Sequence, residues 1–152
     1  MRLFLECKPD ETLAVALGFP AKAIIHSHSK GRVARSLSRH TGVLGMVDED
    51  FGEREPASLR RFVEVSAMHE IRLRTDSERN NRLVVICPRL EPWGMRTVRD
   101  AGLELQRFGL GNSLRDLDAD INHRLPNLQR LVSALLTAQS PRLLHLQSLL
   151  IG

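Results

Sequence analysis

An apolar run is joined directly to an acidic segment in Val43-Leu44-Gly45-Met46-Val47-Asp48-Glu49-Asp50-Phe51-Gly52. The first half of this stretch is the apolar run, which predicts a buried strand over residues 43–47. Its second half places carboxylates directly after that strand, and Gly52 supplies the bend of a turn. Asp48 and Asp50 are two residues apart, so both side chains point to the same side if the strand continues through them.

Two other parts of the chain have the same design, an apolar run followed by acidic residues. Glu6-Cys7-Lys8-Pro9-Asp10 follows an expected strand at residues 2–6, and Pro88-Arg89-Leu90-Glu91-Pro92-Trp93 follows an expected strand at residues 82–87. In an open α/β sheet the carboxyl ends of parallel strands meet at one edge, and ligands bind there. We therefore expect carboxylates from separate parts of the sequence to lie close together.

Carboxylates held close together repel one another unless a cation neutralises them. Clustered oxygen ligands typically bind a divalent cation such as Mg²⁺. A metal-dependent phosphoryl-transfer site is therefore the main hypothesis. The competing interpretation is that residues 48–50 are only an acidic turn after a strand.

Strands and helices alternate in the first part of the chain. The expected strands at residues 2–6, 23–26 and 43–47 are separated by a helix that begins near Pro9 and another with Val33 and Leu37 on its apolar face. Units of this length predict right-handed crossovers and a mainly parallel sheet. Further strands are expected at residues 62–65, 71–74 and 82–87. The last two form either a hairpin or an extension of the sheet edge.

The final part of the chain is expected to be helical. A helix begins near Pro92, Ser113 is suited to the N-cap of the next one, and Pro126 and Pro141 each fit a further helix start. The leucine stripes at residues 128–135 and 143–150 are explained most simply by core packing. They also fit a docking surface for a partner chain.

The composition fits a basic, single-domain protein of 152 residues. Among its 22 basic residues only Lys8, Lys22 and Lys30 are lysines, and the net charge is +4. Arginine forms bidentate contacts with phosphate, so this surface suits a nucleic-acid or acidic-protein partner. An arginine-rich codon usage in a high-GC genome explains the same bias.

Cysteine usage and hydropathy bear on the location of the protein. Its 2 cysteines are too few for a disulfide framework, and the apolar start is too short for a signal peptide. No apolar run is long enough to span a bilayer. We expect a cytoplasmic protein with no membrane partner.

A polar loop precedes the second expected helix. Backbone N–H groups at a helix start bind phosphate readily, and a lysine adds positive charge. The expected phosphate-binding residues are Ser29, Lys30, Gly31 and Arg32. His26 and His28 are two residues apart near this loop, where they either contribute to a metal site or are simply solvated.

Glu6-x-x-x-Asp10 and Asp48-x-Asp50-x-Gly52 resemble the two signature motifs of the TOPRIM domain. That domain occurs in topoisomerases, bacterial primases, recombination-repair proteins and the overcoming-lysogenization-defect nucleases. The resemblance covers about residues 1–110, and it departs from the family pattern where Cys7 replaces the usual Gly.

The resemblance implies a compact Rossmann-like, TOPRIM-like α/β domain over residues 1–110, with a helical C-terminal extension over residues 111–152 packed on it. It implies that Glu6 is a general acid/base or a metal ligand and that Asp48 and Asp50 are metal ligands. Asp10 is then a further ligand or supports one.

Pro88-x-x-Glu91-x-Trp93 resembles a segment of TOPRIM-like nucleases linked to phage defence. There a strand ends in Pro, and Glu-x-Trp opens the next helix. The resemblance implies that Glu91 is an added metal ligand. The competing interpretation is an exposed glutamate at a helix start beside a packed tryptophan.

The function expected from these observations is that of a Mg²⁺- or Mn²⁺-dependent nuclease acting on DNA or RNA. Glu6, Asp48, Asp50 and Lys30 are its expected catalytic residues. By resemblance, it is the effector of an antiviral defence complex, in a hetero- or homo-oligomer with an ATPase subunit. The alternative is a non-catalytic basic subunit of a larger assembly. Strand religation needs a nucleophilic tyrosine, and the chain has none.

Overall fold

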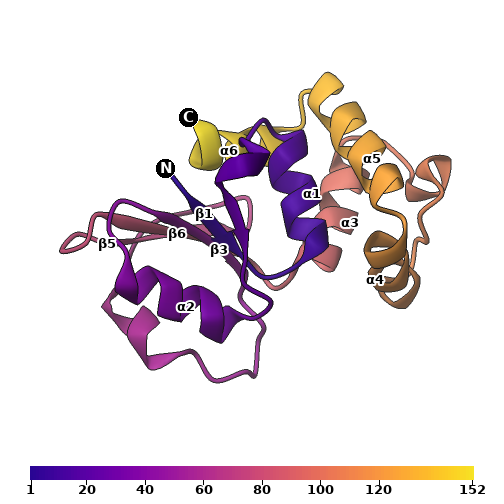
Figure 1. The fold of residues 1–152 in the computed structure, drawn as a ribbon. Coiled ribbons are helices and arrows are strands. Elements are labelled where there is room, and N and C mark those ends of the chain that lie inside the picture. Colours follow the sequence, from indigo (N-terminus) through magenta and orange to yellow (C-terminus); the bar gives the residue numbers. More distant parts are fainter. The chain divides into compact units, whose positions relative to one another are not determined.

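The computed structural model describes all residues 1–152 and is an α/β protein with one six-stranded, mostly parallel mixed sheet and six α-helices (Figure 1). The strand order in the sheet is β2-β1-β3-β6-β5-β4. The strands are β1 (Leu3–Leu5), β2 (Ile24–His26), β3 (Leu44–Asp48), β4 (Val63–Met68), β5 (Ile71–Asp76) and β6 (Asn81–Ile86). Neighbours from β2 to β6 are parallel, and β5 and β4 are added antiparallel. The expected α/β class and mainly parallel sheet are confirmed.

The chain divides into two compact units. The sheet unit comprises residues 1–7 and 20–89, and the helical unit comprises residues 8–19 and 90–152. All six strands and α2 (Lys30–Arg39) belong to the sheet unit. The helical unit contains α1 (Lys8–Ala16), α3 (Leu90–Asp100), α4 (Leu114–His123), α5 (Leu125–Thr137) and α6 (Pro141–Ile151). The expected ranges 1–110 and 111–152 describe a catalytic part and an extension, and that assignment stays a prediction.

Helix α2 packs on one face of the sheet in the sheet unit. Its buried residues Val33 and Leu37 join Phe4 of β1 and Leu83 of β6 in one apolar cluster. Gly45 of β3 permits this close approach, because a Cβ atom at that position would lie 2.9 Å from Leu37 Cδ1. The helix is therefore fixed tightly over the strands whose carboxyl ends carry the acidic residues.

The strands expected at residues 71–74 and 82–87 form a hairpin, which was one of the two interpretations of their pairing. β5 and β6 pair antiparallel, with Ile71 opposite Ile86 and Asp76 opposite Asn81. β4, expected to be short, runs over six residues and forms the outer edge of the sheet. The hairpin thus widens the sheet beside β6.

In the helical unit, the predicted helix starts agree with the structure. Ser113 Oγ accepts a hydrogen bond from the Asp116 N–H at 3.1 Å, and Ser140 Oγ accepts one from the Leu143 N–H at 3.3 Å. The apolar stripes of α5 and α6 are buried at Leu128, Leu131, Val132, Leu135, Leu143, Leu146 and Leu150. These leucines therefore serve core packing. None of the helices combines the length and the apolar character needed to cross a membrane.

Candidate functional site

Glu6 and Asp48 meet at the carboxyl edge of the parallel strands. Glu6 directly follows β1, and Asp48 is the last residue of β3, the parallel neighbour of β1. The Asp48 N–H donates a hydrogen bond to Glu6 Oε2 at 3.3 Å. Two acidic residues that are far apart in the sequence are thus brought together at one edge of the sheet. Their role as ligands stays a prediction.

Asp50 is positioned by a turn, because β3 ends at Asp48. The Asp50 N–H donates to the Pro88 carbonyl at 3.0 Å, and the Glu53 N–H donates to the Asp50 carbonyl at 3.0 Å. Asp50 has a φ of 52° and Gly52 a φ of 92°, both in the left-handed region. The strand therefore does not continue through Asp50, and the condition under which Asp48 and Asp50 would share one side of it is not met.

Lys30 connects the start of α2 to this acidic turn. Its Nζ atom donates to the Glu49 carbonyl at 2.8 Å and lies 3.7 Å from Asp50 Oδ2. The lysine side chain is only 12% exposed, so its ammonium group is directed at the turn. A phosphate group that approaches Asp50 would meet this positive charge.

Ser29 is the N-cap of α2. Ser29 Oγ accepts a hydrogen bond from the Arg32 N–H at 3.1 Å, which uses one of the free amide groups at the helix start. Gly31 and the side chain of Arg32 are exposed. The expected phosphate-binding role of Ser29, Lys30, Gly31 and Arg32 stays a prediction.

Arg72 of β5 is a site residue that the sequence analysis did not identify. Its Nη1 atom lies 2.7 Å from Glu49 Oε2, and its Nε atom lies 2.5 Å from Glu64 Oε1. The hydrogen bond to Glu64 and then the one to Glu49 raise the pKa of Arg72 above its ordinary value, while burial opposes this. The signal was present in the alternation Ile71-Arg72-Leu73-Arg74, which places two arginines on one face of a strand.

Cys87 lies next to the same glutamate. Its Sγ atom is 3.5 Å from Glu49 Oε2. Burial, followed by the negative charge of Glu49, raises the pKa of the Cys87 thiol to about 12. The thiol therefore stays protonated at neutral pH, which makes it a poor nucleophile.

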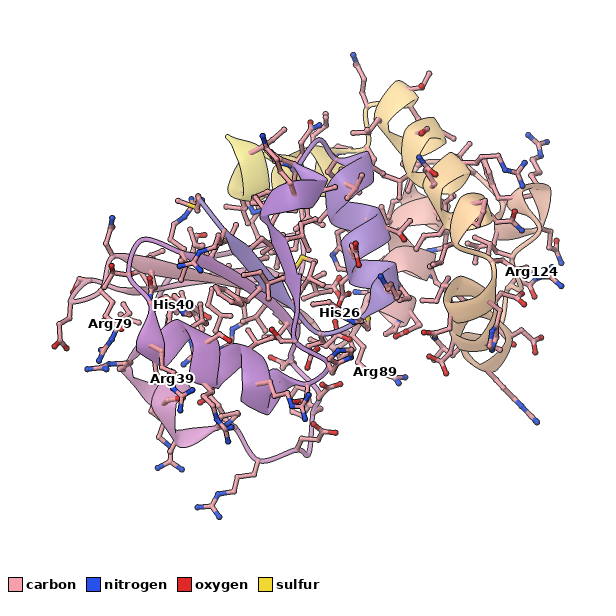
Figure 2. The ribbon with its side chains drawn as sticks, viewed as in Figure 1. His26, Arg39, His40, Arg79, Arg89 and Arg124 are labelled. Carbon is pink, nitrogen blue, oxygen red and sulfur yellow. The ribbon has the colours of Figure 1, made fainter.

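Helix α2 carries a row of arginines on its outer surface. Arg32, Arg35 and Arg39 are exposed, and spacings of three and four residues place them on one side of the helix. Residues 30–39 include no acidic side chain, and none of these three arginines forms an ion pair. Figure 2 shows Arg39 on the side of α2 that faces away from the strands. We call Arg32, Arg35 and Arg39 the arginine row.

His26 and His28 are in contact with each other. Their ring centroids are 4.3 Å apart at an interplanar angle of 41°. His26 ends β2 opposite Leu5, so it lies at the same edge as Glu6. His28 is exposed and His26 is half-buried, and both interpretations of the pair stay predictions.

Asp10 and Glu91, the other expected ligands, belong to the helical unit. Asp10 is buried in the first turn of α1, and Glu91 is half-buried in the first turn of α3. Trp93 is buried, as expected of a packed tryptophan beside Glu91. The role of both acids as ligands stays a prediction. The structure contains no group of three or more His, Cys, Asp and Glu side chains that could hold a metal ion.

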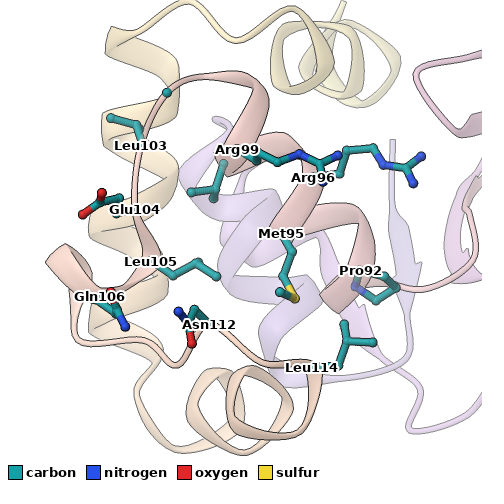
Figure 3. A pocket seen from close by; sticks show the side chains of 12 residues that line it. Pro92, Met95, Arg96, Arg99, Leu103, Glu104, Leu105, Gln106, Asn112 and Leu114 are labelled. Atoms are coloured by element: carbon teal, nitrogen blue, oxygen red, sulfur yellow. The ribbon is translucent and has the colours of Figure 1, made fainter.

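A cavity of about 660 Å³ lies in the helical unit, and none of the residues that line it is an expected site residue. Figure 3 shows Met95, Leu105 and Leu114 along its apolar part and Arg96 and Arg99 beside it. In the sheet unit, a hollow of about 240 Å³ is lined by the acidic turn at residues 49–53 and by Glu55. This hollow of the sheet unit thus lies where acidic residues gather.

Comparisons with protein-family models, with curated proteins and with solved structures find no match to this chain. The resemblance to the TOPRIM domain therefore stays a prediction.

Proposed function

We propose that this protein binds Mg²⁺ or Mn²⁺ at the sheet edge formed by Glu6 and Asp48 and hydrolyses phosphodiester bonds in nucleic acid. One observation carries the proposal. A carboxylate at the end of β1 accepts the backbone N–H of an aspartate at the end of the neighbouring parallel strand β3. Carboxyl ends of parallel strands are the usual position for a ligand in an open α/β sheet.

The donors at this edge fit a magnesium ion. Mg²⁺ prefers hard oxygen ligands, and proteins often bind it through one or two carboxylates while water and substrate phosphates complete its shell. Glu6 and Asp48 would supply those carboxylates, so the absence of a group of three ligating side chains is compatible with the proposal. Asp50, which pairs with Lys30, would act from the adjacent turn.

A bound divalent ion would polarise a phosphoryl oxygen and lower the pKa of a water molecule. The chain's own residues would hold the substrate and balance its charge. The Lys30 ammonium group, fixed by the Glu49 carbonyl, would stabilise negative charge on a phosphate near Asp50. The arginine row would hold the phosphate backbone.

The proposed reaction is direct attack by water on the phosphodiester. The chain contains no tyrosine to act as a covalent nucleophile, and Cys87 is kept as a protonated thiol by a pKa of about 12.

One observation favours the alternative, a non-catalytic basic subunit. Lys30 already neutralises Asp50, so the acidic turn is stable without a metal ion. An ATPase partner and a role in antiviral defence remain predictions from the resemblance.

The test is a cleavage assay on labelled DNA and RNA with Mg²⁺, with Mn²⁺ and with EDTA. We expect metal-dependent cleavage, and a loss of about 100-fold or more in the double variant Asp48→Asn with Asp50→Asn, as for removal of a principal electrostatic group. The matched control is Asp116→Asn with Asp118→Asn, two exposed aspartates at the same spacing on α4. This control should cleave like the wild type.

Binding of Mn²⁺, measured by electron paramagnetic resonance, tests the metal site independently of cleavage. If the wild type neither cleaves nor binds Mn²⁺ better than the double variant, with or without candidate partner subunits, the alternative of a binding subunit replaces the nuclease.

A further inference from the structure

Phe51 is an aromatic residue whose side chain is not packed in the core. It is 87% exposed, the largest value among the exposed large hydrophobic residues. The turn that carries it is formed by the backbone of Asp50, Gly52 and Glu53, through positive φ angles and a hydrogen bond of 3.0 Å. A phenyl ring is not needed for that turn, and its exposure to water is unfavourable. Exposed aromatic rings of this kind serve as stacking platforms for unpaired bases.

The position of Phe51 is linked to α2. Asp50 lies directly before Phe51 and pairs with Lys30, the first residue of α2, at 3.7 Å. The arginine row begins two residues later, at Arg32, and ends at Arg39. A rise of 1.5 Å per residue gives the row a length of about 10 Å, roughly three nucleotides of a strand at 3.4 Å each.

The balance of charge differs between the acidic turn and the helix. In the loop after β3, Glu49 pairs with Arg72, Asp50 pairs with Lys30, and Glu55 pairs with Arg74, while Glu53 is exposed and forms no ion pair. The arginine row has no acidic partner. A polyanion is therefore attracted to the outer face of α2, while ion pairs neutralise three of the four acidic residues in the loop beside it.

We propose that the sheet unit binds single-stranded nucleic acid along α2, with phosphates on the arginine row and one unpaired base stacked on Phe51. A base inside a duplex has both faces covered by its neighbours, so stacking on Phe51 selects an unpaired strand. Cleavage of the bound strand rests on the proposed function, since it would occur at the acidic edge next to Phe51. Binding itself requires no cleavage.

The test measures binding in EDTA, by fluorescence anisotropy, with labelled single strands of DNA and RNA and with a duplex of the same length. The wild type should bind the single strands more tightly than the duplex. Phe51→Ala should weaken single-strand binding about tenfold, within the range measured for one stacked base, and leave duplex binding unchanged. Phe51→Trp should restore single-strand binding.

The arginine row is tested by the dependence of binding on salt. Removing two phosphate contacts, by Arg35→Ala with Arg39→Ala, should reduce the slope of log K against log salt by about 1.4 for a single strand. Matched controls are Arg115→Ala, an exposed arginine of α4, and Val63→Ala, an exposed apolar residue of β4. Both should bind like the wild type, and circular dichroism should show every variant folded.

Three results would each overturn the inference: no single-strand binding by the wild type, equal binding by Phe51→Ala, or equal binding of single strand and duplex. All are obtained without a metal ion. A protein that binds single strands in this way but never cleaves them would refute the proposed function alone. A protein that cleaves while Phe51→Ala binds normally would refute only this inference.

Discussion

Asn81 is a buried polar residue whose replacement should destabilise the sheet unit. It begins β6 and is 1% exposed. Its Oδ1 atom accepts the Val43 N–H at 3.0 Å, and its Nδ2 atom donates to the Leu37 carbonyl at 2.8 Å and to the His40 carbonyl at 2.9 Å. One side chain thus joins the C-terminal end of α2 to the start of β3 and β6.

The size of the effect follows from these three bonds. The variant Asn81→Leu keeps a similar side-chain volume but removes all three hydrogen bonds at once, which leaves their backbone partners unpaired. Each hydrogen bond contributes about 1 kcal/mol net, and the backbone groups left unpaired in the interior add to the cost. We expect the free energy of unfolding to fall by about 3 to 5 kcal/mol, with a melting temperature lower by roughly 6 to 20 °C.

The measurement is urea unfolding followed by circular dichroism, with hydrogen exchange at single amides. The Val43 amide should exchange faster in Asn81→Leu than the drop in global stability explains, because it loses its acceptor. Asn122→Ala is the matched control, since Asn122 is exposed and bonds only within α4. Its effect should stay within about 0.5 kcal/mol. A loss below about 1 kcal/mol in Asn81→Leu would show that the three bonds do not hold α2 on the sheet.

Two further predictions concern the packing at Gly45 and the reactivity of Cys87. Gly45→Ala should destabilise the protein by about 1 to 3 kcal/mol in urea unfolding, because the new methyl group would lie 2.9 Å from Leu37 Cδ1 and 3.1 Å from Leu83 Cδ1. Cys87, with a pKa of about 12, should react slowly with iodoacetamide at pH 8, where about 1 in 10,000 thiols is ionised. Its reaction should accelerate as the pH rises toward 12, and Glu49→Gln should accelerate it at pH 8, as followed by mass spectrometry. Rapid labelling of Cys87 in the folded wild type at pH 8 would contradict the raised pKa of this thiol.

Much of the fold was predictable because local patterns and packing agree. The apolar runs at residues 3–5 and 44–47 are strands whose residues are all buried, as a sheet covered by a helix requires. The caps at Ser113 and Ser140 are local hydrogen bonds, so sequence spacing alone locates them. The proximity of Glu6 and Asp48 followed from the alternation of strands and helices, since parallel neighbours bring their carboxyl ends together.

The rest of the site depends on contacts between residues far apart in the sequence. The direction of Asp50 is set by a backbone turn held by the Pro88 carbonyl, which no local pattern of residues 48–52 reveals. Lys30 was expected to face phosphate, and its contact with Glu49 and Asp50 depends on the packing of α2 over β3. The exposure of Phe51 could not be predicted from the sequence, because phenylalanine is most often found in the protein core.

The antiparallel hairpin of β5 and β6 contributes arginine side chains to the site that the parallel strands do not provide. Glu49 and Glu55 of the loop after β3 are neutralised by Arg72 and Arg74 of β5, a strand that is not adjacent to β3 in the sheet. Without these arginines, the loop would concentrate negative charge next to Asp48 and repel a phosphate group. The hairpin therefore makes an acidic edge compatible with a polyanionic substrate. Under the proposed function, the divalent cation would lie beside Glu6 and Asp48, where the carboxyl ends of β1 and β3 meet.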